Sequence, residues 1–402
     1  MCSSTLKRMS RQRDRYLKKN LQRLCRFAWR HVKLLVWHWG RLGAGPLYAL
    51  KMSQALSAMP EVDVCVSYSR QNEHVQDFRA LDAPRLEVDT FTTALEGLKR
   101  SLGLPLLKHQ FNNFLAENEV DAVYCPMWHP WNSAMVSVLR KRGIPYVLTV
   151  HDAVRHEGDS GRIQRWVEGY EQRRADAYIA LSQHVKSQLD SREHHPAFGT
   201  LVIPHAPFFY SAPTCDGDQE RGALKFLFIG RIRPYKGIDV LLDAFNQVFQ
   251  MSEGDVSLTI AGSGDLGPYE TKLSRLTRVD VRNRWLSDSE FGELIHSHDV
   301  LVLPYIEASQ SGVIAAAHGA GKPVVAFSVG GICEQIDHGV NGLLASDRTP
   351  EGLASELLLL ASDQHLLAEL QEGVKGRSEH ESTWTSSAES VVRLCTSMLT
   401  DR

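Results

Sequence analysis

The sequence predicts an α/β protein with two doubly wound parallel sheets, and three observations favour this fold class. Short apolar runs alternate with amphipathic stretches along most of the chain, which indicates parallel strands covered by helices on both faces. The chain has 402 residues, more than one hydrophobic core usually serves. A polar stretch that contains Pro and Gly, residues 208–222, separates two sets of such runs and is typical of a linker.

The first predicted domain covers residues 34–207 and begins with an apolar run at 34–39. A loop of small residues, Gly43, Ala44 and Gly45, follows it and precedes an amphipathic stretch. Further strands are predicted at residues 62–69, 121–126, 146–152, 176–182 and 200–206. His151 and Asp152 end one of these strands. We expect this pair at the carboxyl edge of the sheet, where doubly wound folds bind their ligands.

The second predicted domain covers residues 223–380 and starts the same pattern again. Its strands are predicted at residues 225–231, 256–264, 279–286, 299–305, 322–328 and 341–346. Helices are expected at 350–361 and 365–374, and another in the last segment, 381–402. Two units of this kind that face a common cleft would place a ligand between their sheets.

The net charge of −2 is an average over two unlike parts. Residues 1–33 contain 11 Lys and Arg and one Asp, so the remaining chain carries a net charge of −12. Helical spacing in this arm puts leucines on one face and cations on the other, which is typical of a helix lying on an anionic membrane surface. A solvated arm, a helix docked on the body and a misassigned start codon are the alternatives. No nucleic-acid partner is expected, because nothing downstream suits base recognition.

Several other classes of protein are disfavoured by the sequence. The seven cysteines are scattered without a C-x-x-C pair and the histidines are scattered too, so neither a disulfide framework nor a metal site is expected. No apolar run approaches the ~20 residues that span a bilayer, and no signal peptide is recognisable. These features favour a cytoplasmic protein, bound peripherally to the inner face of the cell membrane through residues 1–33.

The segment 228–245 carries the clearest chemistry. A strand ends at Gly230, and Arg231, Arg233 and Lys236 follow before a helix begins near Ile238. Cations beside a helix N-terminus suit a pyrophosphate; a solvated basic loop is the alternative. The segment 261–264, AGSG, is likewise the end of a predicted strand followed by a glycine-containing loop. It lacks a full G-x-G-x-x-G, which disfavours a dinucleotide site.

Taken together, these segments resemble the donor domain of GT-B glycosyltransferases of family 4. The resemblance rests on residues 230–237, 261–264, 298–305, 309–326 and 330–344, with weaker similarity at 43–50, 149–152, 180–189 and 202–208. It implies a nucleotide-diphospho-sugar donor, retention of anomeric configuration, no metal or other cofactor, and a final helix, 381–402, that packs back on the first domain.

The resemblance also assigns roles to residues of the second domain. Arg231 and Lys236 match the residues that hold the diphosphate and stabilise the leaving nucleotide. Arg284 and Trp285 lie where the base is held, although Trp285 could be a core aromatic. The full set implied for the donor is Gly230, Arg231, Lys236, Gly262, Arg284, Trp285, Glu307, Ser309, Gln310, Ser311, Gly312 and Glu334. For Glu334, capping or loop ordering is the alternative.

The sequence departs from the family where many members carry two glutamates seven residues apart. Ala308 and Ala316 occupy those positions, and Glu307 is displaced by one. This puts recognition of the ribose in doubt, and residues 309–312, SQSG, are the variant that resembles a subgroup of the family.

In the first domain, His151 and Asp152 are the expected catalytic pair for sugar contact or proton handling. Gly43, Ala44 and Gly45 are expected to approach the phosphates or the acceptor; a simple tight turn is the alternative. The expected acceptor is a saccharide or a lipid-linked molecule of bacterial cell-surface polysaccharide or glycolipid synthesis. The competing hypotheses are an inactive GT-B-like binding or regulatory subunit and a nucleotide-sugar epimerase.

Overall fold

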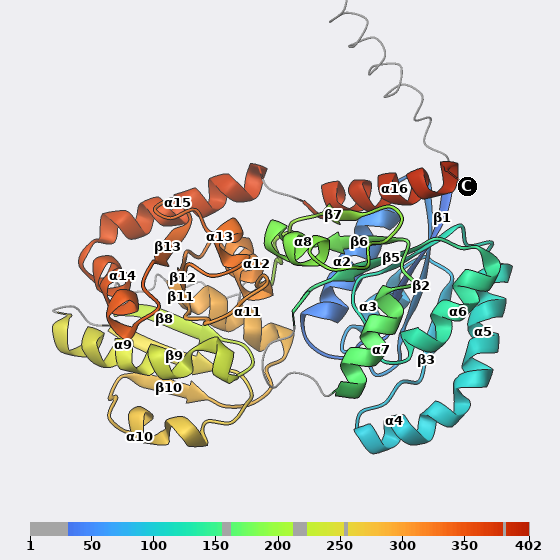
Figure 1. The fold of residues 1–402 in the computed structure, drawn as a ribbon. Coiled ribbons are helices and arrows are strands. Elements are labelled where there is room, and N and C mark those ends of the chain that lie inside the picture. Colours follow the sequence, from blue (N-terminus) through green and yellow to red (C-terminus); the bar gives the residue numbers. More distant parts are fainter. Residues whose placement is uncertain (1–30, 155–161, 212–222, 253–255, 381–382, 402) are drawn as a thin grey trace, which may run out of the picture.

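The computed structural model describes residues 31–154, 162–211, 223–252, 256–380 and 383–401. These residues form two α/β domains side by side, each built on one parallel sheet (Figure 1). The predicted fold class is therefore confirmed. The predicted arm, residues 1–33, lies outside the described residues except for its last three.

The first sheet has seven strands in the order β3-β2-β1-β4-β5-β6-β7. The strands are β1 (Val32–His38), β2 (Val62–Ser69), β3 (Arg85–Val88), β4 (Ala122–Cys125), β5 (Tyr146–Val150), β6 (Ala177–Ala180) and β7 (Thr200–Val202). Strand β1 begins two residues before the predicted boundary at 34, because Val32 and Lys33 pair with Val62 and Asp63. The edge strand β3 was not predicted, since its four residues alternate in polarity.

Helices cover both faces of this sheet. They are α2 (Ala44–Ser57), α3 (Val75–Ala80), α4 (Ala94–Arg100), η1 (Ser101–Gly103), α5 (Leu104–Glu117), α6 (Asn132–Arg142), α7 (Arg162–Gln172) and α8 (Gln183–Asp190). Their ends follow ordinary capping chemistry. The Thr93 hydroxyl accepts a hydrogen bond from the Glu96 N–H, the Ser182 hydroxyl accepts one from the Val185 N–H, and Gly143 ends α6 in a left-handed conformation.

The second sheet has six strands in the order β10-β9-β8-β11-β12-β13. They are β8 (Leu224–Ile229), β9 (Val256–Ala261), β10 (Val279–Arg282), β11 (Val300–Leu303), β12 (Val324–Phe327) and β13 (Gly342–Ala345). Strand β10 is shorter than the predicted 279–286, because it is an exposed edge strand with a neighbour on one side only.

The helices of the second half complete the fold. They are η2 (Pro234–Lys236), α9 (Ile238–Met251), η3 (Gly267–Tyr269), α10 (Glu270–Leu273), α11 (Asp288–Ser297), α12 (Gly312–Gly319), α13 (Ile332–Gln335), α14 (Pro350–Ser362), α15 (Gln364–His380) and α16 (Trp384–Thr400). None of the described helices is both long and apolar enough to cross a membrane.

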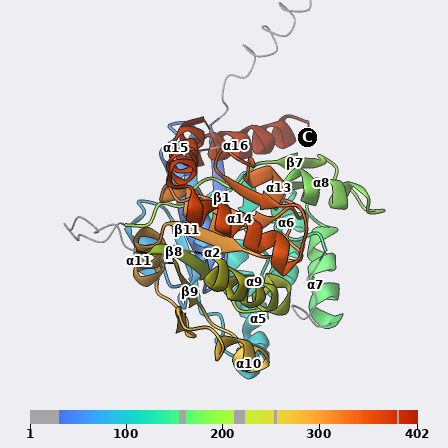
Figure 2. The same cartoon turned by 90° about the vertical axis from the view of Figure 1, so that its left-hand side faces the viewer.

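The last helix returns to the first domain, as Figures 1 and 2 show: α15 stays with the second sheet, and α16 lies along α2. The Trp384 indole N–H donates to the Pro207 carbonyl at 2.9 Å, and its ring centre lies 5.1 Å from that of Tyr48. Phe208, placed in the predicted linker, is buried, and its N–H donates to the Ala315 carbonyl of the second domain. The packed part of the chain therefore extends beyond the predicted boundary at 207.

A buried polar cluster lies inside the first domain, beneath α7. The Glu171 carboxyl group is fully buried and accepts hydrogen bonds from the Tyr146 hydroxyl and, at 3.0 Å, from the Asn132 amide. The same Asn132 amide lies 3.3 Å from the Cys125 sulfur. Burial raises the pKa of Glu171 from 4.5 to about 8, although both hydrogen bonds oppose this. Near neutral pH this carboxyl group is therefore largely protonated.

Candidate active site

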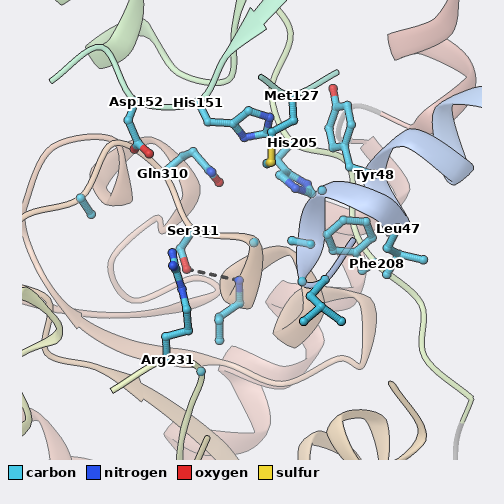
Figure 3. A pocket seen from close by; sticks show the side chains of 18 of the residues that line it. Leu47, Tyr48, Met127, His151, Asp152, His205, Phe208, Arg231, Gln310 and Ser311 are labelled. Atoms are coloured by element: carbon cyan, nitrogen blue, oxygen red, sulfur yellow. Dashed lines mark hydrogen bonds between the residues drawn. The ribbon is translucent and has the colours of Figure 1, made fainter. Parts of the chain in front are cut away.

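A cavity of about 670 Å³ lies between the domains, where the carboxyl ends of both sheets meet. Figure 3 shows side chains of both domains projecting toward it. Most of the predicted site residues line this cavity: Gly43, Ala44, Gly45, His151, Asp152, Gly230, Arg231, Lys236, Gly262, Arg284, Trp285, Glu307, Gln310, Ser311 and Gly312. Ser309 and Glu334 are not part of the lining.

The loop after β8 supplies the cations of the cavity. Arg231 and Lys236 both line it, and Arg231 is exposed toward it. Lys236 ends the short helix η2, and Gly237 follows with a φ of 70°. A Cβ at Gly237 would lie 1.9 Å from the Pro304 carbonyl oxygen. This glycine therefore permits the loop to pack directly on the end of β11.

The neighbouring cation, Arg233, is a different case. The sequence favoured it as a third member of the diphosphate clamp, but its exposed side chain does not line the cavity. Arg233 sits in extended backbone just before η2, so the chain turns there and separates it from Arg231 and Lys236. Arg233 is therefore a solvated cation. A solvated basic loop was the alternative to a diphosphate clamp, and it holds for this one residue.

Tyr305 is a cavity residue that the sequence did not single out. Its ring is 1% exposed, and the Lys236 ammonium lies 3.5 Å from the ring centre. Burial raises the pKa of its hydroxyl, and the Ser311 side chain opposes this shift. The position of Tyr305 just beyond β11, at the same carboxyl edge as Arg231, was the available signal. The aromatic face can hold Lys236 through a cation–π interaction.

We expect Tyr305→Leu to weaken binding of a nucleoside diphosphate by about threefold to thirtyfold, because loss of a buried cation–π contact costs ~0.5–2 kcal/mol. The matching nucleoside monophosphate, which lacks the second phosphate, should bind the variant and the unchanged protein about equally. Tyr305→Phe keeps the ring and should bind the diphosphate within about twofold of the unchanged protein. Calorimetric titration checks this. Equal losses in the Phe and Leu variants would mean that the hydroxyl, not the ring, matters.

The SQSG segment forms the wall beside Arg231. The Ser311 hydroxyl accepts a hydrogen bond from the Val313 N–H at 3.2 Å, shown dashed in Figure 3, so Ser311 is the N-cap of α12. Its own N–H donates to the Gln335 side chain at 2.7 Å. Ser311 therefore starts the helix and also lines the cavity, so its predicted donor-binding role stays a prediction.

Gln310 extends from this wall toward the first domain. In Figure 3 its amide points toward His151 and Asp152. Its buried Oε1 has no hydrogen-bond partner within the described ranges. Gln310 therefore offers a polar side chain to a ligand between the domains, as Glu307 and Ser311 of the same wall also do.

The two predicted donor residues outside the lining join the domains instead. The Ser309 side chain is buried, and its carbonyl oxygen accepts a hydrogen bond from the Ser182 hydroxyl at 2.8 Å. The Glu334 carboxylate accepts from the N–H groups of Gln183 and His184 at 2.6 and 2.7 Å. Glu334 therefore caps α8 of the other domain, which was the alternative for it, and neither Glu334 nor Ser309 lines the cavity.

We expect Glu334→Ala to lower the melting temperature, since loss of a helix N-terminal cap costs ~1 kcal/mol. Donor affinity should stay within about twofold, and Glu334→Gln should keep part of the cap and lose less. Thermal unfolding and nucleotide titration on the same preparations check both statements. A large loss of donor affinity at an unchanged melting temperature would mean that Glu334 contacts the donor.

The glycine loop after β9 packs against the loop after β8. Gly262 has a φ of 137°, and a Cβ there would lie 1.9 Å from the Gly230 carbonyl oxygen. The Asn283 side chain exchanges two hydrogen bonds of 3.1 Å with the backbone of Gly264. The predicted glycines therefore allow the backbones of the two loops to approach each other closely. Because they carry no side chains, the ends of both strands stay open to a ligand.

Arg284 and Trp285 form the rim near this loop. Arg284 is paired with Glu290 at 2.5 Å, which lowers the pKa of that carboxyl group to about 2. Trp285 is 44% exposed and is not the core aromatic that was its alternative. A Cβ placed on Gly43 would lie 4.0 Å from the Trp285 ring. Trp285 thus reaches across the opening to the small-residue loop of the first domain.

The wall formed by the first domain is histidine-rich and aromatic. The His151 Nε2–H donates to the Pro126 carbonyl at 2.8 Å, which makes Nδ1 the basic atom of the neutral ring. Burial lowers the pKa of His205 to about 4, so this ring stays neutral. Tyr48 packs edge-on against both rings. The sequence missed Tyr48, Met127 and Phe208 in this wall; helical periodicity had placed Tyr48 in an ordinary amphipathic stretch.

An acidic cluster borders the small-residue loop and was also missed. The Gly43 N–H donates to the Glu73 carboxylate at 2.6 Å. Burial and the nearby Asp288 raise the pKa of Glu73. His74 lies 3.3 Å from Asp288 across the domain boundary. The cavity is therefore basic beside Arg231 and Lys236 and acidic beside Gly43. In the described part of the chain, no group of three or more His, Cys, Asp or Glu could hold a metal ion.

Comparisons with known proteins agree with this geometry. Residues 47–206 match the profile of the family described as "Glycosyltransferase Family 4", and residues 223–363 match that described as "Glycosyl transferases group 1". An uncharacterised glycosyltransferase of Methanocaldococcus jannaschii is 25% identical over 69% of this chain and 77% of its own length. A D-inositol 3-phosphate glycosyltransferase of Frankia alni is 28% identical over 66% and 72%. The matched part spans 60% of a Mycobacterium tuberculosis glycogen synthase that is 26% identical.

Two solved structures share the whole fold. HepE of Anabaena, in complex with UDP and glucose, superposes with a TM-score of 0.71 at 19% identity, covering 91% of this chain and all of HepE. Sucrose-phosphate synthase of Thermosynechococcus elongatus gives a TM-score of 0.70 at 18% identity, covering 93% of this chain and all of that one. Because fewer than one residue in five is identical, this similarity establishes the fold, which is the arrangement of the two domains.

Proposed function

This chain is a GT-B glycosyltransferase of the family 4/group 1 type, and we propose that it moves a sugar from a nucleotide-diphospho-sugar to a saccharide or lipid-linked acceptor. The observation that carries the proposal is the polarity of the interdomain cavity. Arg231 and Lys236 line one side, and His151 and Asp152 line the other. A diphosphate held by the cations would place its sugar toward His151, Asp152 and Gln310.

The proposed reaction is retaining and uses no metal. The bond between the anomeric carbon and the diphosphate oxygen breaks, and Arg231 and Lys236 stabilise the charge that collects on the leaving nucleoside diphosphate. The acceptor hydroxyl attacks from the same face and forms the new glycosidic bond. Its proton passes to the departing phosphate oxygen. Fixed cations that stabilise a departing diphosphate can serve where a metal ion otherwise would.

His151 and Asp152 are proposed to orient the transferred sugar. The hydrogen bond to the Pro126 carbonyl fixes the His151 ring, so Nδ1 can accept from a sugar hydroxyl or from the acceptor. Gln310 approaches the same place from the opposite domain. This set would recognise hydroxyl groups of the transferred sugar, whereas the alanines at 308 and 316 leave the recognition of the ribose unassigned.

The acceptor and the location are proposed from the basic arm. Residues 1–33 would bind the enzyme to an anionic membrane, on its cytoplasmic face, where lipid-linked acceptors of bacterial surface polysaccharides or glycolipids are glycosylated. Nucleic acid is not a proposed partner. A second candidate function, an inactive GT-B-like binding or regulatory subunit, is favoured by one observation only, the alanines at 308 and 316.

A donor screen tests the proposal. The purified full chain is incubated with UDP-, GDP- and dTDP-sugars, beginning with UDP-glucose because HepE is known with that ligand. Release of nucleoside diphosphate is measured with and without a saccharide or lipid acceptor. Turnover that depends on acceptor supports a transferase, and an altered sugar nucleotide without acceptor indicates an epimerase. Binding without turnover identifies the inactive subunit, and neither binding nor turnover of any donor refutes the proposal.

A further inference from the structure

Four leucines stand exposed together at the corner where α4 turns through η1 into α5. Leu95, Leu98, Leu102 and Leu106 are 65%, 72%, 87% and 64% exposed. We call this set the leucine corner; in Figure 1 it lies on the lower outer edge of the first domain, along α4 and the start of α5. A single exposed leucine is ordinary, but four within twelve residues form an apolar patch that typically marks an interaction surface.

The corner is not a poorly packed part of the core, because the same helices already bury another face. Gly97 is buried, and a Cβ there would lie 3.0 Å from the Phe91 ring. Phe111 and Phe114 on α5 are buried in the core of the first domain. The exposed leucines are therefore an additional apolar face of helices that are already fixed in place.

Cations lie near the leucine corner on α4, α5 and the neighbouring α6, and the acidic residue of α4, Glu96, is paired with Arg100. Lys99 is exposed on α4, and Lys108 lies on α5. The end of α6 brings exposed Lys141 and Arg142 beside α5, where the Arg142 Nε donates to the Asn112 side chain at 2.7 Å. The chain after residue 33 has a net charge of −12. The local excess of cations therefore has the opposite sign to the net charge of this part of the protein. Leucines edged by Lys and Arg match the interface of an anionic bilayer.

The corner is linked to the acceptor side of the cavity by a short segment. The Trp131 indole N–H donates to the Ser101 hydroxyl in η1 at 3.0 Å. Met127 and Trp128, a few residues earlier, line the cavity. Residues 127–131 thus connect the leucine corner to the wall of the cavity.

We propose that the leucine corner inserts into the surface of an anionic membrane and, together with the basic rim, holds the first domain against it. This deepens the proposed function, on which it rests, by placing a membrane contact within the folded domain, separate from residues 1–33. A second copy of the chain is a poorer occupant. A two-fold contact through this patch would bring Lys99, Lys108 and Arg142 of one copy toward the same cations of the other.

Hydrogen–deuterium exchange of the full chain with vesicles tests the contact. Vesicles of phosphatidylcholine containing one part in three of phosphatidylglycerol are compared with vesicles of phosphatidylcholine alone. We expect peptides covering residues 94–110 to exchange more slowly with the anionic vesicles only. Peptides from residues 1–33 are measured separately, so binding through the arm does not conceal the result. Unchanged exchange over residues 94–110, while the arm is protected, would refute the proposal.

The matched variants are Leu98→Glu combined with Leu102→Glu, against Leu359→Glu on α14 of the second domain, which is 44% exposed. We expect the double variant to lower the vesicle partition coefficient by about tenfold or more, since it replaces inserting apolar side chains by carboxylates. The Leu359 variant should partition like the unchanged chain, and equal losses in both would overturn the assignment. Light scattering that shows a dimer abolished by the double variant would identify a second copy instead.

Donor turnover in solution separates this inference from the proposed function. The double variant should keep the UDP-sugar turnover of the unchanged chain, because no residue of the leucine corner lines the cavity. If the unchanged chain turns over no donor yet residues 94–110 are protected by anionic vesicles, the proposed function fails and the membrane surface stands.

Discussion

Replacing Arg231 or Lys236 by alanine is expected to lower kcat by about 10²–10³, the usual effect of removing one preorganised group that stabilises transition-state charge. Both side chains line the cavity at the carboxyl end of β8. Their attraction for the diphosphate grows as negative charge collects on the leaving group. The loss should therefore appear in kcat as well as in kcat/KM for the donor. Initial rates at saturating donor measure it.

Arg233→Ala is the matched control for this prediction. Arg233 has the same charge and belongs to the same loop, but it does not line the cavity. We expect its kcat to stay within about threefold of the unchanged chain. If Arg231→Ala changed only the KM for the acceptor, the diphosphate assignment would be wrong. If the Arg233 and Arg231 variants lost activity equally, the loop would act through its overall charge.

The stability of the first domain is expected to fall by about 1.4 kcal/mol per pH unit, on account of Glu171 alone, as the pH rises from about 5 toward 8. Burial raises the pKa of this carboxyl group from 4.5 in the unfolded chain to about 8 in the folded one. The folded state then holds a proton that the unfolded state has lost. The stabilisation is fully present below pH 4.5 and is lost as the pH rises through 8.

Glu171→Gln isolates this effect, because a neutral amide can still accept hydrogen bonds from Tyr146 and Asn132. Urea unfolding between pH 5 and 8 should show that the free energy of unfolding of the variant increases, relative to that of the unchanged protein, as the pH rises. The free-energy difference between the two should have the slope given above. A difference that does not vary with pH would mean that Glu171 is ionised in the folded protein and that water or rearrangement relieves its burial.

The predicted strands were right where apolar runs are continuous and were wrong at the edges of the sheets. Strands β1, β5 and β8 are buried on both faces, so their sequences are strongly apolar. Strand β3 and the end of the predicted strand 279–286 are edge segments with polar residues. Edge strands bury less apolar area, and their patterns are therefore weak.

The candidate site was predictable wherever loop chemistry follows directly from a strand. Gly230, Arg231, His151 and Asp152 each follow a parallel strand, and the fold collects such positions at one edge. Tyr305 and Glu73 are cavity residues from the same kind of position, but neither stood out, since a tyrosine or a glutamate near a strand end is common. Their significance comes from partners far along the chain, Lys236 and Gly43.

The sequence by itself determined the fold class, the two domains and the basic loop at Arg231 and Lys236, because periodicity and glycine placement act over a few residues. Only the tertiary structure decided which polar groups face the cavity. It turned Arg233 to solvent, made Ser311 a helix cap and placed Glu334 on α8 of the other domain. Those outcomes depend on which backbone N–H groups need partners after the domains pack, and such pairings join residues that are distant in the chain.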